Sequence, residues 1–173
     1  MIVRGTWDWN LIKIETDSGL YGIGEAYWGP GVKDIVHKIL KPQLIGEDPL
    51  NVDKLYTKML MRNAGAGALA GVTVSAASGA EIALWDLAGK KLGSPVWRML
   101  GGYRERLPTY ASTLNGGRHG ILDSIEAYAD FAEQCHALGY RGYKIHGWGE
   151  GDPREEAANL LLCAKRVGDR MTL

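Results

Sequence analysis

The sequence predicts an α+β domain followed by the opening of an α/β domain with parallel strands. Three observations predict this: a hairpin-like pattern near the start, several amphipathic helical repeats before residue 100, and alternating strand-like and helix-like segments after it. Strand, helix, strand, helix, strand at these lengths is typical of parallel βαβ units. We place the boundary so that the two domains cover residues 1–103 and 104–173.

The hairpin lies at residues 11–24. Residues 11–16 alternate between apolar and charged side chains, with Ile12 and Ile14 on one face of the expected strand. Residues 17–19, Asp-Ser-Gly, form a turn that leads into a second strand over residues 20–24.

Helical patterns fill the rest of the first domain. Apolar residues at positions 32, 35, 36, 39 and 40 predict an amphipathic helix that ends near Pro42. Asn51 is an N-cap candidate for a second helix. A third helix carries Ile82, Trp85, Ala88 and Leu92, and the glycine and proline that follow it are typical of a helix end.

The second domain is expected to begin with a strand over residues 108–113. Asp123 and Glu126 then resemble a capping box, which predicts a helix start. This helix is expected to reach Leu138, with Gly139 as its C-cap.

A second strand over residues 142–148 and a second helix come next. Asp152 and Pro153 predict the start of that helix, which runs to about Val167. Residues 171–173 begin a third strand.

Composition indicates a soluble, cytoplasmic protein. Lys plus Arg equals Asp plus Glu at 20 each, which argues against nucleic acid as a partner. The long uncharged run over residues 64–80 is rich in Gly, Ala, Ser and Thr, too weakly apolar for a membrane span. No signal peptide is visible. Cys135 and Cys163 have no metal-type spacing and are expected to be reduced, buried thiols.

Lys144 and His146 are the candidate catalytic residues. They lie two positions apart in the expected strand over residues 142–148, so alternation places both side chains on one face. A charged group that is buried in a protein needs a partner. Two such groups on one face of a strand therefore indicate a chemical role rather than core packing. On spacing alone, an edge or rim position on the sheet is the competing interpretation.

Several segments, taken together and in order, resemble the mandelate racemase and muconate lactonizing enzyme branch of the enolase superfamily. They are residues 14–26 (IETDSGLYGIGEA), 44–49 (LIGEDP) and 83–90 (ALWDLAGK), followed by Pro95 and by residues 100–102 (LGG). The resemblance covers nearly the whole chain.

The resemblance implies a capping domain over residues 1–103, followed by the start of a (β/α)7β modified TIM barrel that is truncated after the third barrel strand begins. It implies abstraction of the proton α to a carboxylate, with Mg2+ stabilising the charge that develops. We expect an acid-sugar dehydratase that acts on a small hydroxy carboxylate, and we expect several copies to assemble. A racemase, epimerase or cycloisomerase of the same family is the alternative.

The resemblance also assigns roles to residues. Lys144 matches the first lysine of the family's Lys-X-Lys motif, and His146 stands where the second lysine would act as base. The family's metal ligands are expected beyond Leu173, so the chain alone is expected to be inactive. A non-catalytic fragment or interaction module is therefore the third hypothesis.

Substrate contacts are expected from three loops. Trp28 lies where the family has a mobile specificity loop, and Arg62 and Asn63 lie in what resembles a second capping loop. Asn115 comes after the first barrel strand, at the end of the barrel where active sites lie. For Trp28, the alternative is that the side chain packs against the barrel. For Arg62, the alternative is a plain surface position.

Overall fold

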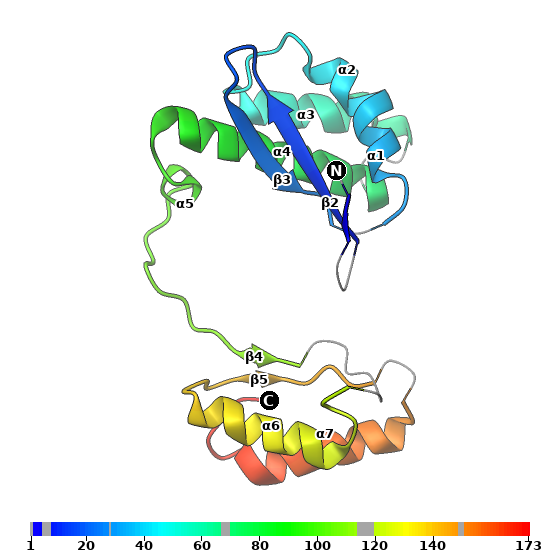
Figure 1. Cartoon of the computed structure of the whole chain (residues 1–173), viewed down its shortest axis with the longest axis vertical. Coiled ribbons are helices and arrows are strands. Elements are labelled where there is room, and N and C mark those ends of the chain that lie inside the picture. The colour runs from blue at the N-terminus through cyan, green and yellow to red at the C-terminus, as the bar shows by residue number, and fades with distance from the viewer. Residues whose placement is uncertain (1, 5–7, 28, 67–69, 114–119, 149–150) are drawn as a thin grey trace. The chain divides into compact units, whose positions relative to one another are not determined.

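The computed structural model describes residues 2–4, 8–27, 29–66, 70–113, 120–148 and 151–173. The chain divides into two compact units, Met1–Tyr103 and Arg104–Leu173 (Figure 1). Within the described ranges, no helix is both long enough and apolar enough to cross a membrane.

The first unit contains an antiparallel sheet of three strands in the order β1-β2-β3. The strands are β1 (Ile2–Arg4), β2 (Asp8–Glu15) and β3 (Tyr21–Glu25). The predicted hairpin is confirmed as β2 and β3, with Ile12 opposite Gly24 and Ile14 opposite Gly22. Ile12 is buried and Lys13 is exposed, as the alternation predicts.

Helices cover one face of this sheet (Figure 1). In chain order they are α1 (Val32–Ile35), η1 (Val36–Leu40), α2 (Lys41–Leu44), α3 (Val52–Arg62), η2 (Ala64–Ala66), α4 (Gly71–Leu92) and α5 (Val96–Met99). The longest, α4, lies directly against β3 and buries small and branched apolar side chains beneath it, among them Ala80, Ala83, Leu84 and Leu87.

Two glycines allow this close approach of β3 to α4. A Cβ atom at Gly22 would lie 1.9 Å from the carbonyl oxygen of Ala83, and one at Gly24 would lie 2.0 Å from that of Gly79. Both neighbours are backbone atoms of the helix, so a side chain at either position would force the strand away from α4.

The helical segment before residue 45 differs from the sequence prediction. Its expected end near Pro42 is wrong, because the helix continues through α2 to Leu44. The middle turn, η1, is a π-helix in which the N–H of Lys41 donates to the carbonyl of Val36. Pro42 then falls in the first turn of α2, where its missing N–H costs little.

Among the other helix boundaries of this unit, one start and one end agree with prediction and one start does not. Asn51 is the N-cap residue of α3, although its side chain makes no capping hydrogen bond. The helix marked by Ile82 and Trp85 begins earlier than expected, at Gly71. Gly93 ends it in the left-handed conformation, with φ of 62°, which confirms the predicted stop.

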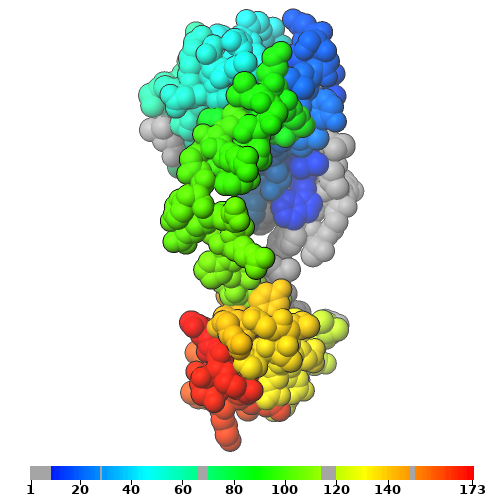
Figure 2. Space-filling model, turned by 90° about the vertical axis from the view of Figure 1, so that its left-hand side faces the viewer, coloured from blue at the N-terminus to red at the C-terminus, as the bar shows by residue number. Residues whose placement is uncertain are grey.

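The second unit contains β4 (Ala111–Ser112), α6 (Ile125–Ala137), β5 (Tyr143–Lys144) and α7 (Pro153–Val167). The predicted parallel arrangement is confirmed: Ala111 pairs with Tyr143, and Gly142 forms a parallel bridge with Thr172. Figure 2 shows the last residues of the chain (red) beside this part of the unit (yellow).

The core of this unit lies between the strands and the helices α6 and α7. Its buried members include Tyr128, Ala132, Tyr143, Cys163 and Val167. The prediction that both cysteines are buried free thiols is confirmed. Burial raises the pKa of the Cys163 thiol to about 11, so it is protonated at neutral pH.

Capping was predicted correctly for α7 and wrongly for α6. Asp152 accepts a hydrogen bond from the N–H of Arg154 at the start of α7. The N-cap of α6 is Ser124 rather than Asp123, because the Ser124 hydroxyl accepts from the N–H of Ala127. Gly139 adopts the left-handed conformation expected after the helix, with φ of 97°.

The strands are shorter than the expected ranges 108–113 and 142–148. At the start of the first range, Pro108 lacks the backbone N–H that a strand residue donates to a neighbouring strand. At the far end of the ranges, the backbone of His146 forms hydrogen bonds with the side-chain hydroxyl of Thr113 instead of with the backbone of the neighbouring strand.

Candidate active site

Lys144 and His146 lie at the C-terminal end of β5. The side chain before Lys144, Tyr143, is buried against α6, and its hydroxyl donates to the carbonyl of Tyr128 at 3.0 Å. Side chains alternate along a strand, so Lys144 projects to the face opposite the helices, where it is exposed. His146 lies two residues later and is half-buried.

The backbone of His146 is held by two side chains from neighbouring elements. Its N–H donates to the hydroxyl oxygen of Thr113 at 2.8 Å, and the Thr113 hydroxyl lies 3.2 Å from the His146 carbonyl, to which it donates. The Tyr128 hydroxyl, from α6, donates to the same carbonyl at 2.7 Å. These three hydrogen bonds fix the direction in which the imidazole leaves the backbone.

Tyr128 is suited to remain a donor at this position. Burial raises the pKa of its hydroxyl, and the negative charge of Glu156 raises it further. The hydroxyl therefore keeps its proton over the range in which proteins function, and the bond to the His146 carbonyl persists.

The imidazole itself has an open hydrogen-bonding position. Nδ1 of His146 is buried and has no partner among the residues that the structure describes. Buried polar atoms in folded proteins are normally paired, so Nδ1 lacks a hydrogen bond that the described residues do not supply.

The chain beyond His146 is anchored as well. The N–H of Trp148 donates to Oε1 of Glu156 at 2.7 Å, and its indole N–H donates to the carbonyl of Leu122 at 2.9 Å. The Trp148 ring also meets Tyr128 edge-on, with 5.3 Å between ring centres. Both ends of the segment that carries His146 are thus attached to the core of the unit.

Sequence reasoning missed Thr113 and Tyr128 as supports of the site. Thr113 could have been found, because it ends the predicted strand over residues 108–113, and the ends of adjacent parallel strands meet at one edge of a sheet. Tyr128 fits the helical pattern of α6 like any core residue, so nothing in the sequence separates it from the others.

The expected substrate contacts of the first unit lie at the end of α3. Arg62 is exposed in its last turn, and Asn63 is the C-cap residue. The Asn63 side-chain amide donates to the carbonyl of Met59 at 2.7 Å, so this donor is already used in ending the helix. Trp28 and Asn115 lie outside the described residues.

The described residues do not supply a metal site. Within those ranges, no group of three or more His, Cys, Asp or Glu side chains is placed to hold an ion. Lys144 and His146 bring a cation and an imidazole, which do not form the carboxylate-rich ligand set that Mg2+ prefers. No step of the chemistry can therefore be assigned to a metal held by these residues.

Comparison with known proteins gives the family. Residues 2–101 match the model of the mandelate racemase / muconate lactonizing enzyme N-terminal domain. D-xylonate dehydratase of Haloferax volcanii is 44% identical over 63% of this chain and 26% of its own length. L-talarate/galactarate dehydratase of Salmonella typhimurium is 36% identical over 94% and 40%. A 3,6-anhydro-alpha-L-galactonate cycloisomerase of Streptomyces coelicolor is 31% identical over 94% and 44%.

Solved structures agree with this result. D-glucarate dehydratase from Agrobacterium tumefaciens, complexed with magnesium, has a TM-score of 0.80 and 29% identity over 95% of this chain and 44% of its own. A mandelate racemase/muconate lactonizing enzyme-like protein from Rubrobacter xylanophilus has a TM-score of 0.79 and 31% identity over 98% and 50%. The chain spans less than half the length of these three curated relatives. It belongs to the mandelate racemase and muconate lactonizing enzyme branch of the enolase superfamily.

Proposed function

We propose that this chain is part of an acid-sugar dehydratase. In this proposal residues 1–103 are the capping domain, and residues 104–173 begin a (β/α)7β barrel that a longer polypeptide completes. The observation that carries the proposal is the position of Lys144 and His146, at the end of a parallel strand and off the helical face. Relatives that remove water from sugar acids support it.

In the proposed reaction, His146 takes the proton from the carbon α to the carboxylate of a small hydroxy carboxylate. The C–H bond breaks and its electron pair moves toward the carboxylate. The amino group of Lys144 binds the carboxylate, where negative charge collects. The electrons then return to form a C=C bond as the C–O bond to the β-hydroxyl breaks. The hydroxyl takes up the proton that His146 had gained and leaves as water, and the resulting enol rearranges to a 2-keto acid.

Magnesium belongs to this proposal through the family, and a neighbour complexed with magnesium supports it. Because the described residues hold no ligand set, the ion would be bound by residues from the rest of the barrel. Arg62, Asn63, Trp28 and Asn115 remain proposed substrate contacts. As the family resemblance implies, several copies are expected to assemble.

Two experiments on a full-length form test the function. A panel of sugar acids is assayed for 2-keto acid formation and, in deuterated water, for exchange of the α-proton. His146→Ala is expected to abolish exchange and leave magnesium binding intact, whereas His136→Ala, on the surface of α6 beside Arg141, is expected to retain both. Unchanged exchange in His146→Ala would remove this residue from the mechanism.

One specific observation favours a second candidate. A cycloisomerase is among the relatives that match nearly the whole chain. Such an isomerase, like a racemase or epimerase, shares the first proton abstraction and differs in the later steps. Exchange or inversion without loss of water would identify an isomerase. A full-length form that shows neither would leave the chain as a non-catalytic module.

A further inference from the structure

The carboxylate of Glu156 lies against the chain directly after His146. Glu156 belongs to the first turn of α7 and is half-buried. Its Oε1 atom accepts a hydrogen bond from the N–H of Trp148 at 2.7 Å. This bond joins the start of α7 to the segment that carries the proposed base.

Two glycines make room for the carboxylate. A Cβ atom at Gly147 would lie 1.9 Å from Oε2 of Glu156 and 2.3 Å from Oε1, and one at Gly151 would lie 2.7 Å from Oε1. The φ angle of Gly147 is outside the left-handed region, so its backbone conformation does not call for glycine. The close approach of Glu156 is therefore the reason that the structure gives for glycine directly after His146.

The negative charge of Glu156 also acts on a second support of His146. Burial raises the pKa of the Tyr128 hydroxyl, and the charge of Glu156 raises it further. Tyr128 donates that proton to the His146 carbonyl at 2.7 Å. Glu156 thus holds the chain after His146 directly and favours the donor form of a residue that holds His146 itself.

The imidazole depends on these backbone contacts for its position. Its Nδ1 atom is buried and has no hydrogen-bond partner among the residues that the structure describes. A hydrogen bond at Nδ1 therefore does not fix the ring, and the backbone decides where the ring lies. Thr113 holds the backbone of His146, and Glu156 holds the two residues that follow it.

We propose that Glu156 is a positioning residue for His146. Its carboxylate, seated against Gly147 and bonded to the N–H of Trp148, fixes the backbone from which the imidazole projects. A shorter side chain would take this acceptor from a buried residue and leave a space beside Gly147. The effect on catalysis rests on the proposed function, whereas the effect on the ring can be measured without a substrate.

Two substitutions in a full-length form separate the acceptor from the charge. Glu156→Ala is expected to lower kcat for α-proton exchange about tenfold and to change KM less than about twofold, because a misplaced base weakens the transition state alone. Glu156→Gln keeps an oxygen that accepts from Trp148 and is expected to recover most of the rate. Glu126→Ala removes an exposed carboxylate from the first turn of α6 and is the matched control, expected to leave kcat unchanged.

Gly147→Ala tests the same contact from the other side. Its methyl group would occupy the space of the carboxylate, so kcat is expected to fall about as far as in Glu156→Ala. In the double variant, Gly147→Ala is expected to add little further loss, because the carboxylate that it displaces is gone. Losses that multiply in the double variant would show that the two residues do not act through this contact, and would overturn the proposal.

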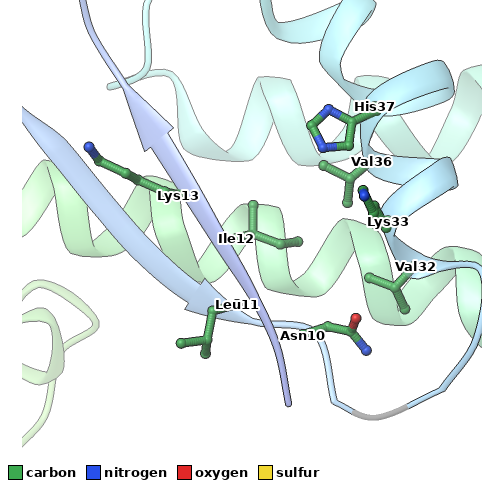
Figure 3. A pocket seen from close by; sticks show the side chains of 8 residues that line it. All are labelled: Asn10, Leu11, Ile12, Lys13, Val32, Lys33, Val36 and His37. Atoms are coloured by element: carbon green, nitrogen blue, oxygen red, sulfur yellow. The ribbon is translucent and has the colours of Figure 1, made fainter. Parts of the chain in front are cut away.

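Histidine ring signals in NMR spectra report the position of the imidazole without a substrate. The His146 signal is identified by its loss in His146→Ala. It is expected to shift or broaden in Glu156→Ala and to stay near its original place in Glu156→Gln. His37 lies on η1 in the first unit, beside a cavity along β2 (Figure 3), and is the internal reference whose signal is expected to stay in place.

The outcomes separate this proposal from the proposed reaction. An unmoved His146 signal in Glu156→Ala would overturn the positioning role, as would a higher KM with unchanged kcat. If the unaltered full-length form does not exchange the α-proton but the His146 signal responds as expected, the proposed reaction is wrong and Glu156 still positions the ring.

Discussion

The carboxylate of Asp86 accepts a hydrogen bond from the backbone N–H of Ile23 at 2.8 Å, across 63 residues of sequence. Lys90, one turn further along α4, lies 2.7 Å from the same carboxylate oxygen and also donates to the Tyr21 carbonyl. The helix thereby satisfies polar groups on the outer edge of β3. This gives a structural reason for Asp86 in the segment over residues 83–90 on which the family resemblance partly rests.

Replacing Asp86 by Ala is expected to lower the free energy of unfolding of the first unit by about 1–2 kcal/mol, because a hydrogen bond to a charged acceptor is lost. Burial opposes ionisation of Asp86, yet the bonds from Lys90 and Ile23 outweigh it and lower its pKa. Chemical denaturation measures the change. Lys91→Ala, at an exposed position of the same helix, is expected to change stability by less than about 0.5 kcal/mol. Equal losses in the two variants would contradict the edge-protection role.

Gly24→Ala is expected to destabilise the first unit by about 3 kcal/mol or more, since its Cβ has no room beside α4. The nearest atoms are the Gly79 carbonyl oxygen at 2.0 Å and the Ala83 nitrogen at 2.7 Å, neither of which can rotate away. Gly65→Ala is the matched control, because a Cβ there meets nothing within 4 Å. Denaturant midpoints of the two variants check the prediction, and a Gly24→Ala midpoint near that of Gly65→Ala would show that β3 can shift at little cost.

The charge of Glu47 is expected to support stability at moderately low pH. Hydrogen bonds from Lys54 and Lys58 lower the pKa of Glu47 from its ordinary value of 4.5 to about 2. A carboxylate with a lowered pKa stabilises the fold above the ordinary value, and this stabilisation is lost as pH falls from about 4.5 through about 2.

Glu47→Gln removes the group that titrates. Thermal unfolding between pH 7 and pH 2 is therefore expected to show a smaller fall in stability for Glu47→Gln than for the unaltered chain. Asp53→Asn is the control, since it also removes an acidic group from this region, at the start of α3. If Glu47→Gln and the unaltered chain lose stability in parallel, the pairing with the two lysines contributes nothing.

Thr113→Val is expected to slow α-proton exchange in a full-length form by about tenfold, the equivalent of one lost hydrogen bond. Valine keeps the shape of threonine and removes the hydroxyl that holds the N–H and carbonyl of His146. Thr113→Ser restores the hydroxyl and is expected to recover most of the rate. The His146 amide should also exchange faster with solvent in Thr113→Val alone. Equal rates in the two variants would mean that the hydroxyl does not position His146.

Local patterns in the sequence were sufficient to predict most elements. The alternation around Ile12 and Ile14 predicted the hairpin, and the Asp152-Pro153 pair predicted the start of α7, because both signals act over a few residues. The end of the helix at Pro42 was mispredicted for a related reason. Proline is a strong local stop signal, but the π-turn before it places Pro42 at the start of a new helical turn, where it is tolerated.

Relationships between distant segments could not be predicted in the same way. Alternation placed Lys144 on a defined face of its strand, yet nothing in the sequence tied Thr113 and Tyr128 to the backbone of His146, which lies 33 and 18 residues away. These contacts depend on how the elements pack.

The π-turn of η1 has a consequence for how relatives can differ in length. A π-turn contains one residue more than an α-turn, so loss of one residue between Val36 and Leu40 would restore regular α-helix. Val32 on one side and Gln43 on the other would still face inward after such a loss. Single-residue gaps in alignments of this family should therefore be admissible inside this helix, where a deletion elsewhere would rotate every following side chain by about 100°.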